Sequence, residues 1–548
     1  GIINVKTVYG AKGDGITDDT QRLLKAIKEN IGLAKDKTLY FPNGIYLVSN
    51  RLEWKDLSGN WSTCLTLQGQ SREKTIIKLK DNTSGYSDFN TPKAVIYTAS
   101  RNSISPLGEG NQAHHNNIYD LTVDVGKGNP GAIGIDFLAN NKGTLRDVTI
   151  RSGDGQGRTG LALSRKWPGP CLIKNVQIER FAYGILAVHA EYSVTFVNIT
   201  LMQQRSAGLH NNGNVLSIRG LTSTNTVPVI QNVSAAGLVT LLDGNFTGGT
   251  ASVSAIDNQG ALYVRNLTTS GYKSAIQNKG TVVPGNSHSE FCSHNRLSLF
   301  PSPAASLQLP VKAAPNYHNN DLSTWANVAA YGAKGDDWNN DTAAIQAAMD
   351  SGKSTIYFPL GRYLVSTTIR VRGSVKHIIG MESVLGPAWD SFSDTNNPLP
   401  FLRFESGTAD AVIVERLNFG KLHSASPSPG VVWVEHASPK TLVLRDVQLG
   451  GENKMVYRNT LGAGELFLEN VVGGKWRFDY PQNVWARHLN TEVNDLKIRN
   501  NGGKLWILGI KTENLGENTN RTPTVIETTG GGQTEVLGGL LYPVQPVG

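Results

Sequence analysis

Short apolar runs interrupted by one polar or glycine residue recur along the chain. Each run has the form apolar–x–(Asp, Asn or Gly)–apolar, as in IYDL at 118–121 and LRDV at 145–148. The pattern continues at 173–176, 196–199, 218–221 and 264–267. The runs repeat every ~22 to 28 residues with one double step, which suits one coil of a stacked solenoid. No long amphipathic helix follows each run, so the pattern predicts the strands of a parallel β-helix.

The second half of the chain begins the same pattern again. Its runs lie at 415–419, 444–447, 468–471, 486–489, 507–510 and 536–540. Longer phrases are duplicated as well: YGAKGDGITDDT at 9–20 is echoed by YGAKGDDWNNDT at 331–342. LYFPNGIYLVS at 39–49 returns as IYFPLGRYLVS at 356–366. The chain therefore contains two homologous units, and we predict an all-β fold of two tandem right-handed parallel β-helices.

The two predicted units are separated by a stretch of different composition. Residues 298–321 read SLFPSPAASLQLPVKAAPNYHNND and are rich in Pro, Ala and Ser, which is typical of a linker. We therefore predict a first β-helix over 1–297, a linker over 298–321 and a second β-helix over 322–548.

The duplicated acidic motif is predicted to begin each β-helix with a capping helix. Apolar residues after each copy follow helical spacing, namely Leu23, Leu24 and Ile27, then Ile345, Ala348 and Met349. Thr17 or Asp18 is the predicted N-cap of the first helix. We interpret the motif's aspartates as loop and capping residues, not as catalysts or calcium ligands. They are Asp14, Asp18, Asp19, Asp336, Asp337 and Asp341.

Composition and charge narrow the possible partners. The 548 residues exceed one ordinary core, and the net charge of +8 is not gathered in a basic run with interleaved aromatics. We expect a solvated basic surface, no nucleic acid partner, a monomer, and no membrane span, because no stretch of ~20 apolar residues occurs. Cys64, Cys171 and Cys292 are far apart without a CxxC, so no metal site or disulfide framework is predicted and their disulfide state is left open.

Two glutamates share one register on neighbouring coils. Counting three places from the second apolar residue of each run gives Glu492 after Leu489 and Glu513 after Ile510; the flanking coils give Gly474 and Pro543. Two close carboxylates repel, so one is expected to have a raised pKa and to suit general acid catalysis. The alternative is that both are ordinary solvated residues at coil corners.

Aromatic residues near the two glutamates are candidates for sugar binding. They are Trp485, Trp506, Trp476 and Tyr480. Rings of this kind stack on the apolar faces of sugars, so we expect them to form a substrate platform.

The whole chain resembles bacterial members of glycoside hydrolase family 55. The resemblance rests on HSEFCSHNRLSLFPSPAASLQLPV at 288–311 and on the pair VWARHLNTE at 484–492 and GGKLWILGIKTE at 502–513. The YGAKGD start is shared more widely among pectate-lyase-like β-helices. The family contains secreted, exo-acting β-1,3-glucanases that act on laminarin, so the resemblance implies such a hydrolase with no cofactor.

The resemblance also implies roles for individual residues. Hydrolysis in the family proceeds with inversion, and the general acid falls on Glu513. A second glutamate that positions or activates the water falls on Glu492, with a Gln and a Ser from the first β-helix. Gln204, or its neighbour Gln203, and Ser223 are the residues that fit. Inverting pairs are ~6.5–9.5 Å apart, so residues on adjacent coils favour an assisting role for Glu492.

Two other readings of the sequence stay open. A polysaccharide lyase needs a base and a cation near a uronate, and no in-register aspartates for calcium or repeated Arg/Lys pair is found. A non-catalytic, tailspike-like β-helix would bind glycans through exposed aromatics. The start at Gly1 fits a processed secreted protein or a recombinant fragment, and we expect a secreted protein.

Overall fold

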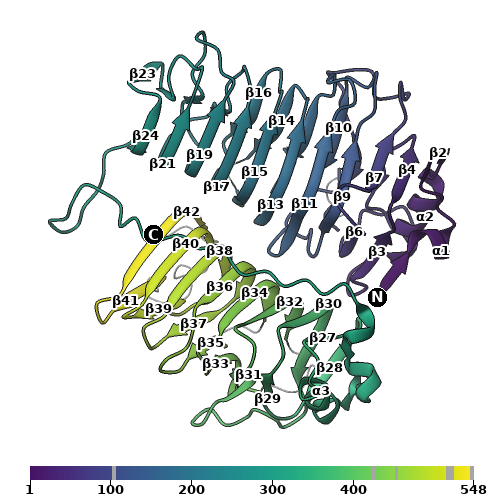
Figure 1. Ribbon diagram of the computed structural model, residues 1–548, viewed down its shortest axis with the longest axis vertical. Coiled ribbons are helices and arrows are strands. Elements are labelled where there is room, and N and C mark those ends of the chain that lie inside the picture. Colours follow the sequence, from purple (N-terminus) through teal and green to yellow (C-terminus); the bar gives the residue numbers. More distant parts are fainter. Residues whose placement is uncertain are drawn as a thin grey trace. The chain divides into compact units, whose positions relative to one another are not determined.

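A computed structural model of the chain describes all residues except 102–106, 190, 421, 423–427, 451–453, 514–523 and 543–548. The chain divides into two compact units, Ile2–Ala305 and Ser306–Gly548 together with Gly1. Each unit is a stack of parallel strands (Figure 1), so the predicted all-β fold of two parallel β-helices is confirmed. Among the described residues, no helix has both the length and the apolar character of a membrane span.

The first unit contains a 14-stranded and a 10-stranded sheet. In path order the larger sheet runs through β1 (Ile2–Asn4), β3 (Lys37–Phe41), β6 (Leu65–Gly69), β9 (Asn117–Asp124), β11 (Gly143–Arg151), β13 (Cys171–Glu179), β15 (Val194–Met202), β17 (Val215–Thr224), β19 (Leu238–Thr247), β21 (Ala261–Thr269) and β24 (Ser287–Cys292), with β2 (Asp14–Asp18), β4 (Gly44–Val48) and β7 (Thr75–Leu79) beside this path. The smaller sheet holds β5 (Leu52–Glu53), β8 (Lys93–Tyr97), β10 (Ala132–Asp136), β12 (Thr159–Leu163), β14 (Tyr183–Val188), β16 (Ala207–Asn212), β18 (Ile230–Asn232), β20 (Ile256–Asn258), β22 (Ile276–Asn278) and β23 (Thr281–Val283). Among the described strands, only the pairs β21–β24 and β22–β23, at the end of the stack, are antiparallel.

The second unit repeats the plan with an 11-stranded and a seven-stranded sheet. The larger holds β25 (Ala326–Asn327), β27 (Thr355–Tyr357), β30 (His377–Pro387), β32 (Ala411–Phe419), β34 (Thr441–Leu449), β36 (Leu466–Gly473), β38 (Asn483–Thr491), β40 (Lys504–Thr512) and β42 (Gln533–Leu541), with β26 (Asp336–Asn340) and β28 (Arg362–Val365) beside this path. The smaller holds β29 (Ile369–Gly373), β31 (Leu399–Gly407), β33 (Val431–His436), β35 (Met455–Asn459), β37 (Lys475–Phe478), β39 (Ile498–Asn501) and β41 (Ile526–Thr529).

The third residue of each predicted run, or the second in the run 415–419, is a corner in the left-handed backbone conformation. Asp, Asn and Gly tolerate this conformation best, which explains the composition of the repeat. The corner residues, with φ of 52 to 73°, are Asp120, Asp147, Asn175, Asn198, Gly220, Asp243 and Asn266 in the first unit and Arg416, Asp446, Asn470, His488, Gly509 and Gly538 in the second. Asp243 belongs to β19, which supplies the coil missing from the predicted double step.

Side chains of equal register form continuous ladders inside each stack. In the first unit the ladder includes Ile118, Leu145, Ile173, Phe196 and Ile218, all of them buried. In the second it includes Val414, Leu444, Leu468, Ala486 and Ile507. Each unit therefore has its own apolar core.

Helices cap the start of each stack, as predicted. The first unit has α1 (Val5–Tyr9) and α2 (Thr20–Asn30), and the second has η1 (Leu322–Thr324), η2 (Val328–Tyr331) and α3 (Thr342–Met349). The predicted N-cap of α2 is wrong by one or two residues, because Asp19 occupies that position. Its carboxylate accepts hydrogen bonds from the backbone N–H groups of Lys12 and Gly13, both at 2.8 Å. Asp341 binds Lys334 and Gly335 in the same way, so these aspartates fix the loop before each helix.

An extended segment, residues 306–317, packs along the second unit and is called the strap below. Glu535 on β42 accepts the N–H groups of Gln308 and Leu309 at 3.1 and 3.2 Å. Further along, Trp485 Nε1 donates to the Pro310 carbonyl at 2.8 Å, and Tyr317 OH bonds Ser354 Oγ at 2.8 Å. The strap therefore runs against the stacking order, from the last strand back to the first coil (Figure 1).

Candidate functional site

Glu492 and Glu513 directly follow two neighbouring strands. Thr491, the last residue of β38, pairs with Thr512, the last residue of β40, so the glutamates occupy the same register, as predicted. Their side chains are 30% and 19% exposed. The pair is therefore partly open to solvent, as two reacting groups must be.

The register predicted for the last coil is wrong by one residue. Gly538 takes the corner in β42, so Gly539 pairs with Ile510 and Leu540 pairs with Lys511. The residue aligned with Glu513 is then Tyr542 rather than Pro543, and Pro543 itself lies outside the described residues.

A lysine that sequence reasoning missed connects the two glutamates. Lys511 lies between the strand positions of Ile510 and Thr512, and its side chain is only 1% exposed. Its ammonium group donates hydrogen bonds to Oε1 of both Glu492 and Glu513. Asn490, which pairs with Lys511 across the strands, donates from Nδ2 to the same oxygen of Glu492 at 2.9 Å. Because residues alternate along a strand, the place of Lys511 two residues before Glu513 was a usable signal.

The shared ammonium changes the electrostatics expected of the pair. The sequence predicts two carboxylates that repel each other, whereas the structure places a cation within bonding distance of both. Two acceptors of one ammonium lie about 4.5 Å apart when both bonds have ordinary geometry. That is shorter than the ~6.5–9.5 Å typical of an inverting acid–base pair.

A second buried lysine, Lys497, lies between β38 and β39. Lys497 is fully buried, and its ammonium donates to the Val493 carbonyl. Burial lowers the pKa of Lys497, while the nearby Asp495 and Glu492 carboxylates act in the opposite direction. Positive charge therefore balances the acidic groups on this edge of the second unit.

The structure corrects the prediction that Gln204 and Ser223 of the first unit hold the attacking water. Gln204 and Ser223 are both buried. Ser223 aligns with the core residues Leu201 and Phe246, so its side chain points into the stack. Asn225 donates to Gln204 Oε1 at 2.8 Å and to Ser223 Oγ at 2.7 Å, which makes an internal polar cluster. Neither residue presents a polar group to a substrate at the surface; the neighbouring Gln203 is exposed.

The predicted aromatic platform is also largely wrong. Trp476 is fully buried in the core and stacks on Tyr457 at 5.9 Å between ring centroids. Trp485 and Trp506 are paired in register but lie before the corners at His488 and Gly509, whereas the glutamates lie after them. Both rings are nearly covered. Tyr480 alone of the four is exposed, and its role as a sugar contact stays a prediction.

Trp485 and Trp506 instead line a cavity of about 360 Å³ beneath the strap. The strap contributes Leu309, Pro310, Val311 and Lys312, and Lys312 pairs with Glu465 at 2.5 Å. The Trp485 indole therefore anchors the strap, and both rings lie before the corners that precede the two glutamates.

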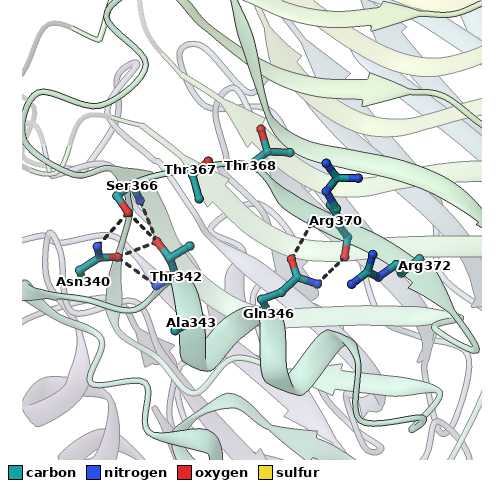
Figure 2. Close-up of a pocket in the computed structure, with 9 residues that line it drawn as sticks. All are labelled: Asn340, Thr342, Ala343, Gln346, Ser366, Thr367, Thr368, Arg370 and Arg372. Carbon is teal, nitrogen blue, oxygen red and sulfur yellow. Dashed lines mark hydrogen bonds between the residues drawn. The ribbon is translucent and has the colours of Figure 1, made fainter.

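A larger cavity of about 540 Å³ lies beside α3 (Figure 2). Thr342 and Asn340 bond each other and Ser366 there, and Gln346 bonds the backbone of Arg370. The Arg370 and Arg372 guanidinium groups already pair with Glu405 and Asp350 at 2.9 and 2.8 Å. The cavity holds no predicted site residue, and its cations are already engaged.

A relative and a solved structure share most of the length of this chain, and a second relative matches a short segment. Glucan 1,3-beta-glucosidase of Cochliobolus carbonum is 22% identical over 465 residues, 74% of this chain and 56% of its own. A probable glucan endo-1,3-beta-glucosidase of Arthroderma benhamiae is 36% identical over 94 residues, 17% of this chain and 11% of its own. The chain thus spans about half, or less, of these relatives. The solved structure of sacteLam55A from Streptomyces sp. SirexAA-E matches 99% of this chain and 86% of its own, with 11% identity and a TM-score of 0.48.

A family of pectate lyase-like proteins matches more than half of the chain. The matched residues are 2–237 and 325–381, which cover most of the first stack and the start of the second. Glu492 and Glu513 lie beyond the matched residues. Together with the parallel stacks of both units, this match shows that the chain belongs to the rhamnogalacturonase A/epimerase, pectate lyase-like family.

Proposed function

We propose that the protein is a glycoside hydrolase that cleaves β-1,3-glucan. The observation that carries the proposal is the pair Glu492 and Glu513, aligned on one partly exposed edge and bound to one buried lysine. Two carboxyl groups of this kind are the usual machinery of glycoside hydrolysis. The names of the two fungal relatives supply the substrate class.

In the proposed reaction Glu513 donates a proton to the departing glycosidic oxygen. Glu513 is the less exposed of the two glutamates, and Lys511 holds both carboxylates in fixed positions. We propose that the enzyme acts at the end of the glucan chain and inverts the configuration of the anomeric carbon, with Glu492 as a positioning residue. Because both carboxylates bind one ammonium, we propose that another group activates the attacking water. Gln204 and Ser223 do not fit that role, because they are buried in the first core.

The stereochemistry of the first product tests the proposed inversion. Laminarin hydrolysis followed by proton NMR is expected to show α-glucose first. β-Glucose first would assign retention, for which a separation of ~5–5.5 Å is typical, and would make Glu492 the nucleophile.

Glu513→Gln tests the proposed function itself. Gln keeps the shape of the side chain but has no proton to give, so turnover of laminarin should fall by a factor on the order of 10³ or more while laminarin binding persists. A glycan-binding β-helix without catalysis would show no turnover in the wild type. A lyase would form an unsaturated product that absorbs in the ultraviolet and would lose activity with a chelator.

Secretion and a monomeric state are part of the proposal. A polymeric glucan is too large to enter a cell, so the enzyme would meet it outside. Cell fractionation of the source organism and light scattering of the purified protein test the two statements. Activity confined to the cell pellet, or a mass twice that of the 59.1 kDa chain, would contradict them.

A further inference from the structure

Three potential metal ligands from separate parts of the first unit meet at one place. One ligand atom each from Asp36, Cys64 and His115 lies within 4.8 Å of the other two. His115 Nδ1 and Asp36 Oδ1 are 2.7 Å apart. Sequence spacing predicts no metal site, because none of these residues belongs to a short ligand motif.

The three residues occupy one corner of three consecutive coils. Lys37 pairs with Leu65, which aligns Asp36 with Cys64 one residue earlier. Thr66 pairs with Asn117, which aligns Cys64 with His115 two residues earlier. All three have left-handed backbone, with φ of 45, 64 and 52°. Rungs of a stack are ~4.8 Å apart, so the fold itself holds the three side chains together.

The second unit shows that the fold does not require these residue types. Asp36, Cys64 and His115 lie three residues before the paired core positions Leu39, Leu67 and Ile118. The same register of the second unit, three residues before Ile356, Ile378 and Val414, holds Lys353, Val375 and Ala411. That set offers no thiolate, imidazole or carboxylate. The cluster is therefore specific to the first unit and is not a general feature of the capped start.

We propose that Asp36, Cys64 and His115 bind a zinc ion. A thiolate, an imidazole and a carboxylate are the ligands that Zn²⁺ takes in proteins, whereas Ca²⁺ and Mg²⁺ prefer all-oxygen sites. Thiolate and carboxylate together balance the charge of the ion. Zinc bonds of ~2.0–2.3 Å place ligand atoms about 3.3–3.8 Å apart, so small side-chain rotations close the site.

One side of the proposed site is open to solvent. Cys64 is buried, while Asp36 and His115 are 12% and 19% exposed. A water molecule would complete four-coordinate geometry from that side. The ion would tie the first three coils together beside the capping helices, so its expected effect is stabilisation of the start of the stack.

Cobalt binding to the full chain tests the proposal. Co²⁺ added to chelator-treated protein is expected to give a thiolate-to-cobalt charge-transfer band at one equivalent, and Zn²⁺ should abolish it. Cys64→Ser should remove the band, and His115→Ala should weaken binding at least ~10-fold. Cys292→Ser is the matched control, because Cys292 is partly exposed and outside the cluster, and it should leave the band unchanged.

The melting temperature gives a second readout that does not depend on activity. Zinc at 100 times its Kd is expected to raise the melting temperature of the wild type but not of Cys64→Ser, whose circular dichroism reports whether it folds. No band in the wild type, a band that survives Cys64→Ser, or loss of the band in Cys292→Ser would overturn the proposal. The cluster would then be a hydrogen-bonded His–Asp pair beside a buried thiol.

Discussion

At the scale of single residues, a buried cation organises the proposed active site. Lys511 is bonded to both Glu492 and Glu513, and Asn490 holds one of the same oxygens. Without the ammonium, two carboxylates would face each other in a partly buried place, which costs free energy and separates them. The geometry of the pair therefore depends on a residue that is itself almost completely buried.

Lys511→Met should lower kcat for laminarin about 100-fold or more, with a smaller effect on KM. Methionine fills the space of the lysine stem but leaves the glutamates without their common partner. Lys376→Met, an exposed lysine elsewhere in the same unit, should leave kcat within about twofold. Equal kcat values for Lys511→Met and the wild type would show that the ammonium does not position the pair.

His436 should make the protein less stable in mild acid. Its ring is buried between Tyr457 OH and the Lys440 carbonyl, at 3.0 and 2.8 Å, and burial lowers its pKa to about 4. The unfolded chain binds a proton near pH 6.5 and the folded chain does not. Protonation of His436 therefore costs no free energy of unfolding above about pH 7. As the pH drops towards 4, it lowers the free energy of unfolding by about 3 kcal/mol.

Urea unfolding of the wild type and His436→Gln at pH 7 and pH 4.5 measures this effect. The variant should be less stable at pH 7 but should lose less stability on acidification, since it removes the titrating ring. Identical losses in the two proteins would mean that other groups set the acid sensitivity.

At the scale of elements, the corners and the strap decide which side chains are accessible. The sequence was sufficient to predict the coils, because Asp, Asn or Gly marks every left-handed corner except Arg416 and His488, and to align Glu492 with Glu513. It was also possible to see that Ser223, two residues after Leu221, shares its inward face. That the strap covers Trp485 could not be predicted, because Pro310 and Trp485 are 175 residues apart in the sequence.

Glu535→Ala should loosen the strap without unfolding the stack. The Glu535 carboxylate is the acceptor for two strap amides, those of Gln308 and Leu309. Hydrogen exchange of these amides should become at least ~10-fold faster. Glu465→Ala removes only a side-chain pair with Lys312 and should change their exchange little. Unchanged exchange in Glu535→Ala would show that other contacts hold the strap.

At the scale of the whole molecule, the chain is two stacks with separate cores. The duplicated motifs predicted this division, because each copy begins a new stack with its own cap. The Asp36, Cys64 and His115 cluster could not be predicted, since it arises only when coils of unequal length are brought into register.

A cavity in one core should disturb mainly its own stack. Ile173→Ala in the first unit and Leu444→Ala in the second each remove a fully buried side chain, at a cost of about 2–5 kcal/mol. Hydrogen exchange by mass spectrometry should rise in the strands around each substitution and stay unchanged in the other unit. Equal rises in both units would show that they unfold as one.

The strap gives the order of synthesis a structural meaning. Residues 306–317 leave the ribosome before every strand that they contact. Glu535, which accepts the N–H of Gln308, is synthesised 227 residues after Gln308. Each new coil can therefore add beneath a segment that is already present, while the last strand alone supplies the carboxylate that fastens its beginning. A chain that ends before β42 would lack Glu535, so the beginning of the strap can bind in its native place only after β42 has formed.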